Sequence, residues 1–151
     1  MTRRQEFGEF INGHPIRCEW QSQHSWGYFW KVDEWIYYAD PIKPMTYVAP
    51  NGDEVQPDKH FHTDFGSIPP PLLAFPSLSR TRFIHSYLMH DSGYRHGGLW
   101  YRRPGASIFT FIGMSKQDCD DFMVTCIGAE GGNAMQRAMI YTGVRMGRGI
   151  S

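Results

Sequence analysis

The stretch His90-Asp91-Ser92-Gly93-Tyr94-Arg95 places a histidine beside a carboxylate in a segment with helical periodicity. Asp91 falls in the middle of the apolar face of this predicted helix, and His90 falls at its edge. Burying a carboxylate is costly unless a cation, a metal or several hydrogen-bond donors compensate it. Such a conflict between pattern and burial is typical of a functional site. The apolar face itself is formed by Phe83, Ile84, Tyr87, Leu88 and Tyr94.

Composition and charge limit the kind of protein. The chain has 151 residues, which suits a single domain (residues 1–151) with a sizeable core. Fifteen Lys and Arg residues balance 15 Asp and Glu residues, so nothing favours a polyanion such as nucleic acid as a partner. Cys18, Cys119 and Cys126 are predicted to be free thiols made in a reducing compartment. The sequence predicts neither a signal peptide nor a membrane-spanning segment.

The first part of the chain, residues 1–62, is predicted to be rich in strands. Two aromatic-rich runs, Trp26–Lys31 and Glu34–Ala39, predict a β-hairpin with Val32-Asp33 between its strands. Met45–Ala49 predicts a further strand among prolines. Residues 63–78 contain three consecutive prolines, which block helix formation, so we expect an ordered loop or an extended run there.

The rest of the chain, residues 79–151, is predicted to be mostly helical. Ser77 or Ser79 can cap a first helix that runs to about Arg95 and ends at Gly97-Gly98. A third helix is predicted from about Asn133 to Met146, closed by Gly147. Strands followed by helices indicate an α+β domain, with an N-terminal strand region packed on a three-helix C-terminal core.

The second helix brings another carboxylate to this core. It follows a short predicted strand, residues 107–112, and begins at Ser115, with Asp118 completing a pattern like a capping box. Its apolar stripe has the spacing i, i+3, i+4, i+7, i+8. Asp120 lies at the edge of the stripe, whereas Asp118 and Asp121 point away, so Asp120 is best placed to meet the first helix. The stripe consists of Cys119, Phe122, Met123, Cys126 and Ile127.

These side chains suggest a specific chemistry. A histidine whose far nitrogen is held by a buried carboxylate is a positioned general base, which predicts His90 as the base and Asp120 as the residue that orients it. Asp91 is then the main ligand of a calcium ion that stabilises an oxyanion as water attacks an ester carbonyl. The loop around Asp64, Phe65 and Gly66 is expected to complete the oxygen shell, because glycine allows close backbone approach.

Residues 85–127 resemble the two-helix catalytic core of secreted phospholipase A2. The resemblance lies in His90-Asp91-x-Gly93-Tyr94-Arg95 and in a second helix with Asp120-x-x-Met123. It implies that His90 is the base, Asp91 the calcium ligand and Asp120 the second member of the catalytic pair. It also implies that Tyr94, the tyrosine of the HDxxY motif, supports this pair.

A broader resemblance, over about residues 26–147, is to domain-of-unknown-function family 1353. Members of this family occur mostly in bacteriophage and prophage genomes, so the resemblance implies a phage-encoded protein made in the host cytoplasm. The residues that carry it are Thr63-Asp64-Phe65-x-Ser67-Ile68-Pro69, His90-Asp91-x-x-Tyr94, Ser115 with Asp120, and Arg137 with Tyr141, Val144 and Gly147.

Simpler interpretations stay open for each of these residues. His90, Asp91 and Asp120 also suit a buried polar network that fixes helix packing. His60 and His62 share one face of a strand, where they suit an exposed edge or, with Asp64, a zinc site. Five apolar or aromatic residues suit core or partner packing or contact with a phospholipid surface, namely Leu99, Trp100, Tyr101, Phe109 and Phe111.

Three functions follow from these patterns. The first is a calcium-assisted, phospholipase-like ester hydrolase that a phage uses against the host envelope. The second is a non-enzymatic virion component of the tail or connector, packed against other virion proteins or copies of itself. The third is a metal-dependent phosphohydrolase of the HD type, which needs a further histidine such as His62 or His85 beside His90-Asp91, and whose normally all-helical fold fits the strand-rich start poorly.

Overall fold

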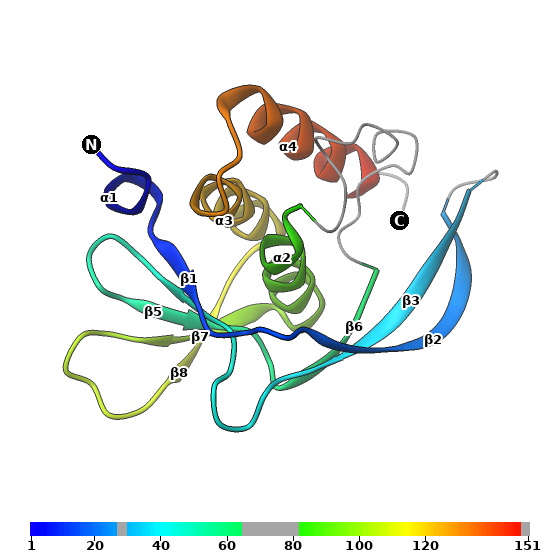
Figure 1. Ribbon diagram of the computed structural model, residues 1–151. Coiled ribbons are helices and arrows are strands. Elements are labelled where there is room, and N and C mark those ends of the chain that lie inside the picture. Colours follow the sequence, from blue (N-terminus) through cyan, green and yellow to red (C-terminus); the bar gives the residue numbers. More distant parts are fainter. Residues whose placement is uncertain (27–29, 65–81, 149–151) are drawn as a thin grey trace.

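The computed structural model (Figure 1) describes residues 1–26, 30–64 and 82–148. Within these ranges the chain forms both strands and helices, which confirms the predicted α+β class. The strands come mainly from the N-terminal half and the helices mainly from the C-terminal half. The elements are α1 (Arg3–Phe7), β1 (Glu9–Ile11), β2 (Arg17–Trp26), β3 (Trp30–Tyr38), β4 (Thr46–Val48), β5 (Glu54–Gln56), β6 (His60–Thr63), α2 (Ile84–His96), β7 (Gly98–Arg102), β8 (Thr110–Gly113), α3 (Lys116–Ala129) and α4 (Ala134–Arg148).

Two antiparallel sheets carry the helices on one side, as Figure 1 shows. One sheet has the strand order β1-β4-β5-β7-β8, and the other has the order β2-β3-β6. Helix α2 packs against β6 of one sheet and β7 of the other, and α3 packs against both α2 and α4. Helix α2 therefore lies where the two sheets and the helical layer meet.

The predicted hairpin exists, but its turn is not at Val32-Asp33. In the structure Val32 pairs with His24 and Asp33 pairs with Gln23, so both lie within β3. The pairing continues to Trp26 and Trp30, and the residues between them, 27–29, lie outside the described residues. The prediction failed because a β-branched valine favours a strand over a turn, and the aromatic run continues on either side of it.

The first predicted helix ends as expected but begins later. Helix α2 starts at Ile84, and its N-cap residue, Phe83, makes no side-chain capping bond. Ser77 and Ser79, the predicted caps, lie outside the described residues. At the other end Gly97 adopts the left-handed conformation, with φ of 77°, which a residue without a Cβ tolerates.

The other helical elements agree with the sequence patterns except at their ends. Ser115 and Asp118 form the predicted capping box at the start of α3. Asn133 accepts a hydrogen bond from the Gln136 amide at the start of α4, and this helix continues through Gly147 to Arg148, so the predicted stop at Gly147 is wrong. Strand β7 was not predicted, and β8 lies slightly later in the chain than the predicted strand at 107–112.

The core forms two apolar clusters around α2 and α3. One cluster joins the sheets to α2 through residues such as Tyr47, Phe61 and Leu88. The other joins α2, α3 and α4 through Tyr87 and Ile127, among others. Nine consecutive residues of α2, from His85 to Gly93, are buried. A helix that is buried on all sides must satisfy its own polar side chains internally, and this condition shapes the site.

Two further predictions concern thiols and membranes. All three cysteines are free, with Cys119 and Cys126 buried and Cys18 partly buried. Burial raises the pKa of Cys119 to about 11, as expected for a thiol packed as a small apolar group. Across the described ranges, none of the helices has the length and apolar character that crossing a membrane requires.

Candidate functional site

The two polar side chains predicted to meet across the helices do so. His90 on α2 and Asp120 on α3 join through a distance of 2.8 Å between the imidazole Nε2 and the carboxylate Oδ1. Their side chains are only 2% and 1% exposed. At this degree of burial a hydrogen bond between a ring nitrogen and a carboxylate is strong, because the interior screens charge poorly.

Asp91 faces away from Asp120, toward the end of β6. Its Oδ2 accepts a hydrogen bond of 2.6 Å from the Thr63 hydroxyl and one of 3.1 Å from the Asp64 backbone amide. Its Oδ1 lies 3.7 Å from Nδ1 of His90. The rotation of about 100° between consecutive helical residues thus lets His90 reach α3 while Asp91 reaches the neighbouring strand.

The two aspartates set the ionisation of His90. Burial alone lowers the pKa of a histidine, but the hydrogen bond to Asp120 and the negative charges of Asp91 and Asp120 outweigh it and raise the pKa to about 9. Burial raises the pKa of Asp91, yet its interactions with His90, Arg95 and Thr63 lower it overall. At neutral pH the site is therefore an imidazolium held between two carboxylates.

Tyr94 lies one helical turn beyond His90 and packs against it. The two ring centroids are 5.2 Å apart and the ring planes are tilted by 34°. The Lys116 ammonium at the start of α3 lies 5.0 Å from the centroid of the Tyr94 ring. Tyr94 therefore packs against the imidazole ring of His90 and against Lys116.

The predicted calcium ligands are only partly within the described residues. Asp64 is buried, and its Oδ2 lies 4.0 Å from Nη2 of Arg95. Phe65 and Gly66 lie outside the described residues. Among residues 1–26, 30–64 and 82–148, no group of three or more His, Cys, Asp or Glu side chains is arranged to hold a metal ion.

The histidines weighed as further metal ligands lie elsewhere. His60 and His62 do share the exposed face of β6, while Phe61 and Thr63 are buried. Nδ1 of His62 lies 3.8 Å from a Glu34 carboxylate oxygen. Asp64 is buried, unlike the two exposed histidines, and the three form no metal-binding group in the described part of the chain.

A second buried polar cluster was not predicted. The Glu130 carboxylate accepts hydrogen bonds of 2.7 Å and 2.6 Å from the amide and hydroxyl of Ser86, and lies 3.0 Å from Nδ1 of His85. It ties the start of α2 to the end of α3. Glu130 comes three residues after the end of the predicted stripe, but sequence spacing alone does not indicate that its side chain meets residues 44 and 45 positions earlier.

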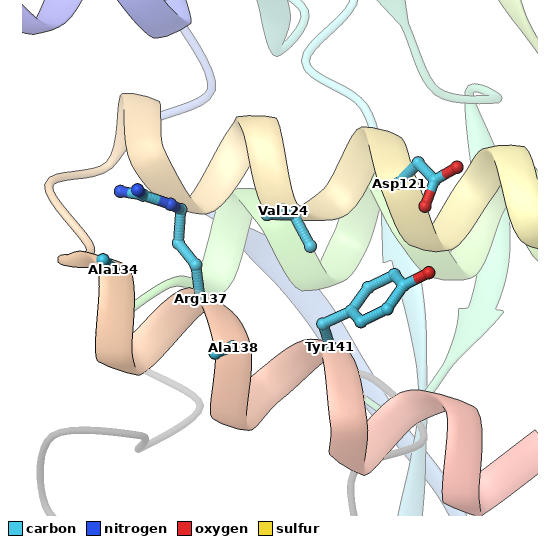
Figure 2. Close-up of a pocket in the computed structure, with 6 residues that line it drawn as sticks. All are labelled: Asp121, Val124, Ala134, Arg137, Ala138 and Tyr141. Atoms are coloured by element: carbon cyan, nitrogen blue, oxygen red, sulfur yellow. The ribbon is translucent and has the colours of Figure 1, made fainter.

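A shallow groove of about 390 Å³ runs between α3 and α4 (Figure 2). Figure 2 shows Tyr141 and Asp121 at one end of the groove and Arg137 at the other. Arg137 packs over the Phe7 ring at 4.6 Å, and the Tyr141 hydroxyl accepts a 2.7 Å hydrogen bond from Gln117. Since these polar groups are committed to neighbours, Arg137 and Tyr141 hold elements together. The remaining lining residues are Val124, Ala134 and Ala138.

The fold and the site define an α+β protein with a buried histidine–aspartate pair between two helices. The chain matches the family described as protein of unknown function, DUF1353, over residues 30–144, and it belongs to that family. Neither the curated proteins nor the solved structures contain a match to the chain. Thr63, Asp64, Asp91 and Asp120, which carry the resemblance in separate parts of the sequence, come together at the site.

Proposed function

We propose that this chain is a phage-encoded ester hydrolase with a phospholipase A2-like site, in which His90 is the general base. The observation that supports it is the 2.8 Å bond between His90 Nε2 and Asp120 Oδ1. This bond commits one ring nitrogen to a carboxylate, while Nδ1 makes no hydrogen bond within the described residues. A base needs this arrangement, with one nitrogen fixed and the other left to take a proton.

In this proposal the side chains divide the work of hydrolysis. His90 takes a proton from water at Nδ1 as the water oxygen attacks the ester carbonyl, and the same nitrogen returns the proton to the leaving alcohol as the ester C–O bond breaks. Asp120 holds the Nε2–H and stabilises the imidazolium that forms in between, and Tyr94 keeps the ring in place. The proposal includes a calcium ion: Asp91 and Asp64 would hold it, with carbonyls of Phe65 and Gly66, and it would supply positive charge for the developing oxyanion.

Two properties of His90 define what the proposal requires. The imidazole is 2% exposed, so the site must open before water and an ester reach Nδ1. The pKa of about 9 keeps the ring protonated at neutral pH, so the base form increases as the pH rises. Neutralising the charge of Asp91 lowers the pKa of His90 and brings the base form into the neutral range.

The proposed substrates are esters of the host envelope, with phospholipids first. The test is release of fatty acid from phospholipid vesicles and cleavage of a soluble short-chain ester, with calcium or with a chelator. We expect turnover by the wild type that increases between pH 7 and about 9 and a loss of roughly a hundredfold or more in His90→Asn, since a positioned base contributes at least that much.

Controls separate a lost base from a lost fold. Asp121→Asn removes an exposed carboxylate from the same helix as Asp120 and should leave the rate unchanged. Circular dichroism of each variant checks that it folds. Cleavage of neither ester by a folded wild-type protein contradicts the proposal, as does full activity in His90→Asn.

A second candidate is a non-enzymatic virion component of the tail or connector, made in the host cytoplasm. The observation that favours it is a set of large apolar side chains exposed on and next to the edge strand β8. Exposed apolar groups at a sheet edge suit packing against another virion protein or a second copy of this chain. They are Trp100, Ile108, Phe111 and Ile112, exposed by 37%, 72%, 40% and 45%.

Particle composition separates the two candidates. For the virion component, the protein should be found in purified particles in several copies, and particles should still assemble when the gene carries His90→Asn. Absence of the protein from purified particles contradicts this second candidate.

A further inference from the structure

A second cavity lies apart from the His90–Asp120 pair, where the two sheets meet the end of α2. It has a volume of about 660 Å³. Strand β5 and the segment after it form one wall, the first residue of β6 and the last residue of α2 form another, and β7 and the segment before β8 close it. It is lined by Gln56, Pro57, Asp58, Lys59, His60, His96, Trp100 and Phe109.

Asp58 holds the polar part of this cavity in a fixed arrangement. Its backbone amide donates a 2.9 Å hydrogen bond to the buried Ser92 hydroxyl on α2. Its Oδ1 accepts a 2.7 Å hydrogen bond from the Trp100 indole, and its Oδ2 lies 2.8 Å from Nδ1 of His96. One carboxylate therefore orients both an indole and an imidazole, which is the preorganisation that a binding site needs.

The aromatic side chains of the cavity offer a surface for a ring. Trp100 is 37% exposed although its N–H is satisfied by Asp58, so its apolar surface is available while its polar atom is not. Phe109 also lines the cavity, and the Arg102 guanidinium lies 4.5 Å from the centroid of its ring. His60 is stacked on Tyr38 at 5.9 Å. Such walls favour flat or cyclic ligands over extended chains.

The polar side chains of the cavity that have no partner within the described residues favour an anionic ligand. Both Asp58 oxygens are already engaged, and the Gln56 amide donates to Thr46 at 2.9 Å. Lys59 is exposed, and its ammonium forms no ion pair within the described residues. His96 donates its Nδ1–H to Asp58, so the positive charge beside this part of the lining comes from Lys59. A negatively charged group at this end of the cavity meets the Lys59 ammonium.

We propose that this cavity binds a small molecule that combines a ring with one anionic group, a carboxylate or a phosphate. The ring packs against Trp100 and Phe109, and the anion meets Lys59. Two sources share this chemistry, namely acidic sugars and nucleotides. The site shares no ligand-binding side chain with the His90–Asp120 pair, so it stands whether or not that pair is catalytic.

The experiment is a titration of the ¹⁵N-labelled protein followed by NMR at the indole N–H signal of Trp100, which Trp100→Phe assigns. The probes are glucuronate against glucose, adenosine monophosphate against adenosine, and inorganic phosphate alone. We expect at least one of the two ring-bearing anions to shift this signal saturably at millimolar concentration. Its uncharged counterpart should bind about tenfold more weakly or worse, as expected for the loss of a charged hydrogen bond.

Two lysine variants show where the charge acts. Lys59→Ala should reduce the affinity for the anion to that for the uncharged counterpart, whereas Lys43→Ala, an exposed lysine elsewhere, should leave it unchanged. Binding of glucuronate alone identifies an acidic sugar as the source, and binding of the nucleotide alone identifies a nucleotide. Three results overturn the proposal: no shift with either anion, equal binding of charged and uncharged probes, or inorganic phosphate binding as tightly as the nucleotide.

Discussion

His90 shows how the neighbours of one residue determine its chemistry. Its Nε2 is 2.8 Å from Asp120 Oδ1 and its Nδ1 is 3.7 Å from Asp91 Oδ1, so two carboxylates lie on opposite sides of one buried ring. Helical periodicity was enough to predict that His90 points toward the partner helix and Asp91 toward the preceding segment, because consecutive residues of a helix are rotated by about 100° around its axis. Periodicity did not predict that Thr63 and the Asp64 amide satisfy Asp91, since that contact depends on the path of β6.

The ionisation of His90 is measurable directly. In a chelator-containing buffer, NMR titration of the wild type should give His90 a pKa of about 9, well above the ordinary value of 6.5. Asp120→Asn should lower that pKa because it removes a charge and a charged hydrogen bond while keeping the shape of the side chain. A His90 pKa at or below 6.5, or one that Asp120→Asn leaves unchanged, contradicts the described network.

The role of Asp91 separates a metal site from a structural carboxylate. If calcium belongs to the site, calorimetry should show saturable binding to the wild type and none to Asp91→Asn, since the carboxylate supplies the main charge. Asp121→Asn is the matched control and should bind as the wild type does. Absence of binding at millimolar calcium to the folded wild type removes calcium from the proposed mechanism.

Among the secondary-structure elements, the helices were predicted better than the strands. Helix α3 was predicted from its stripe and its capping box because both signals lie within one segment. The turn of the hairpin was misplaced because strand-forming residues continue through Val32 into β3. Strand β7 was missed because it is short, begins at a glycine and is stabilised by pairing with other strands. Its partner β5 lies far earlier in the chain and its partner β8 lies after it, so no local pattern indicates the strand.

The capping box gives a prediction for α3. Ser115→Ala removes the hydroxyl that accepts a 3.0 Å hydrogen bond from the Asp118 backbone amide. We expect a loss of about 1 kcal/mol in the free energy of unfolding, the usual cost of losing an N-cap. Urea denaturation measures it, with Ser107→Ala in an exposed segment as the control. Equal stability of Ser115→Ala and the wild type would show that the cap contributes nothing.

For the whole molecule, α2 links the two sheets to the helical layer, and its buried polar residues link ionisation to folding. The raised pKa of His90 stabilises the fold fully below pH 6.5, the ordinary pKa, and this contribution is lost as the pH rises through about 9. The lowered pKa of Asp91 acts in the other direction, so its contribution is present above its ordinary pKa of 3.8 and is lost at lower pH.

The pH dependence of stability tests this link. Between pH 6.5 and 9 the wild type should lose stability on the order of 3 kcal/mol, since each pKa unit corresponds to about 1.4 kcal/mol. Chemical denaturation at each pH measures it, and subtraction of the His90→Asn curve removes the other titrating groups. Parallel curves for the two proteins contradict a stabilising imidazolium.

The most direct test of the central claim is fatty-acid release from phospholipid vesicles by the wild type and His90→Asn side by side, in calcium at pH 8. If His90 is the base of an ester hydrolase, the wild type releases fatty acid and the folded variant is slower by roughly a hundredfold or more. If the folded wild type releases none, or both proteins release it at the same rate, the His90–Asp120 pair is not the catalytic pair of a phospholipase, and the phospholipase-like function fails.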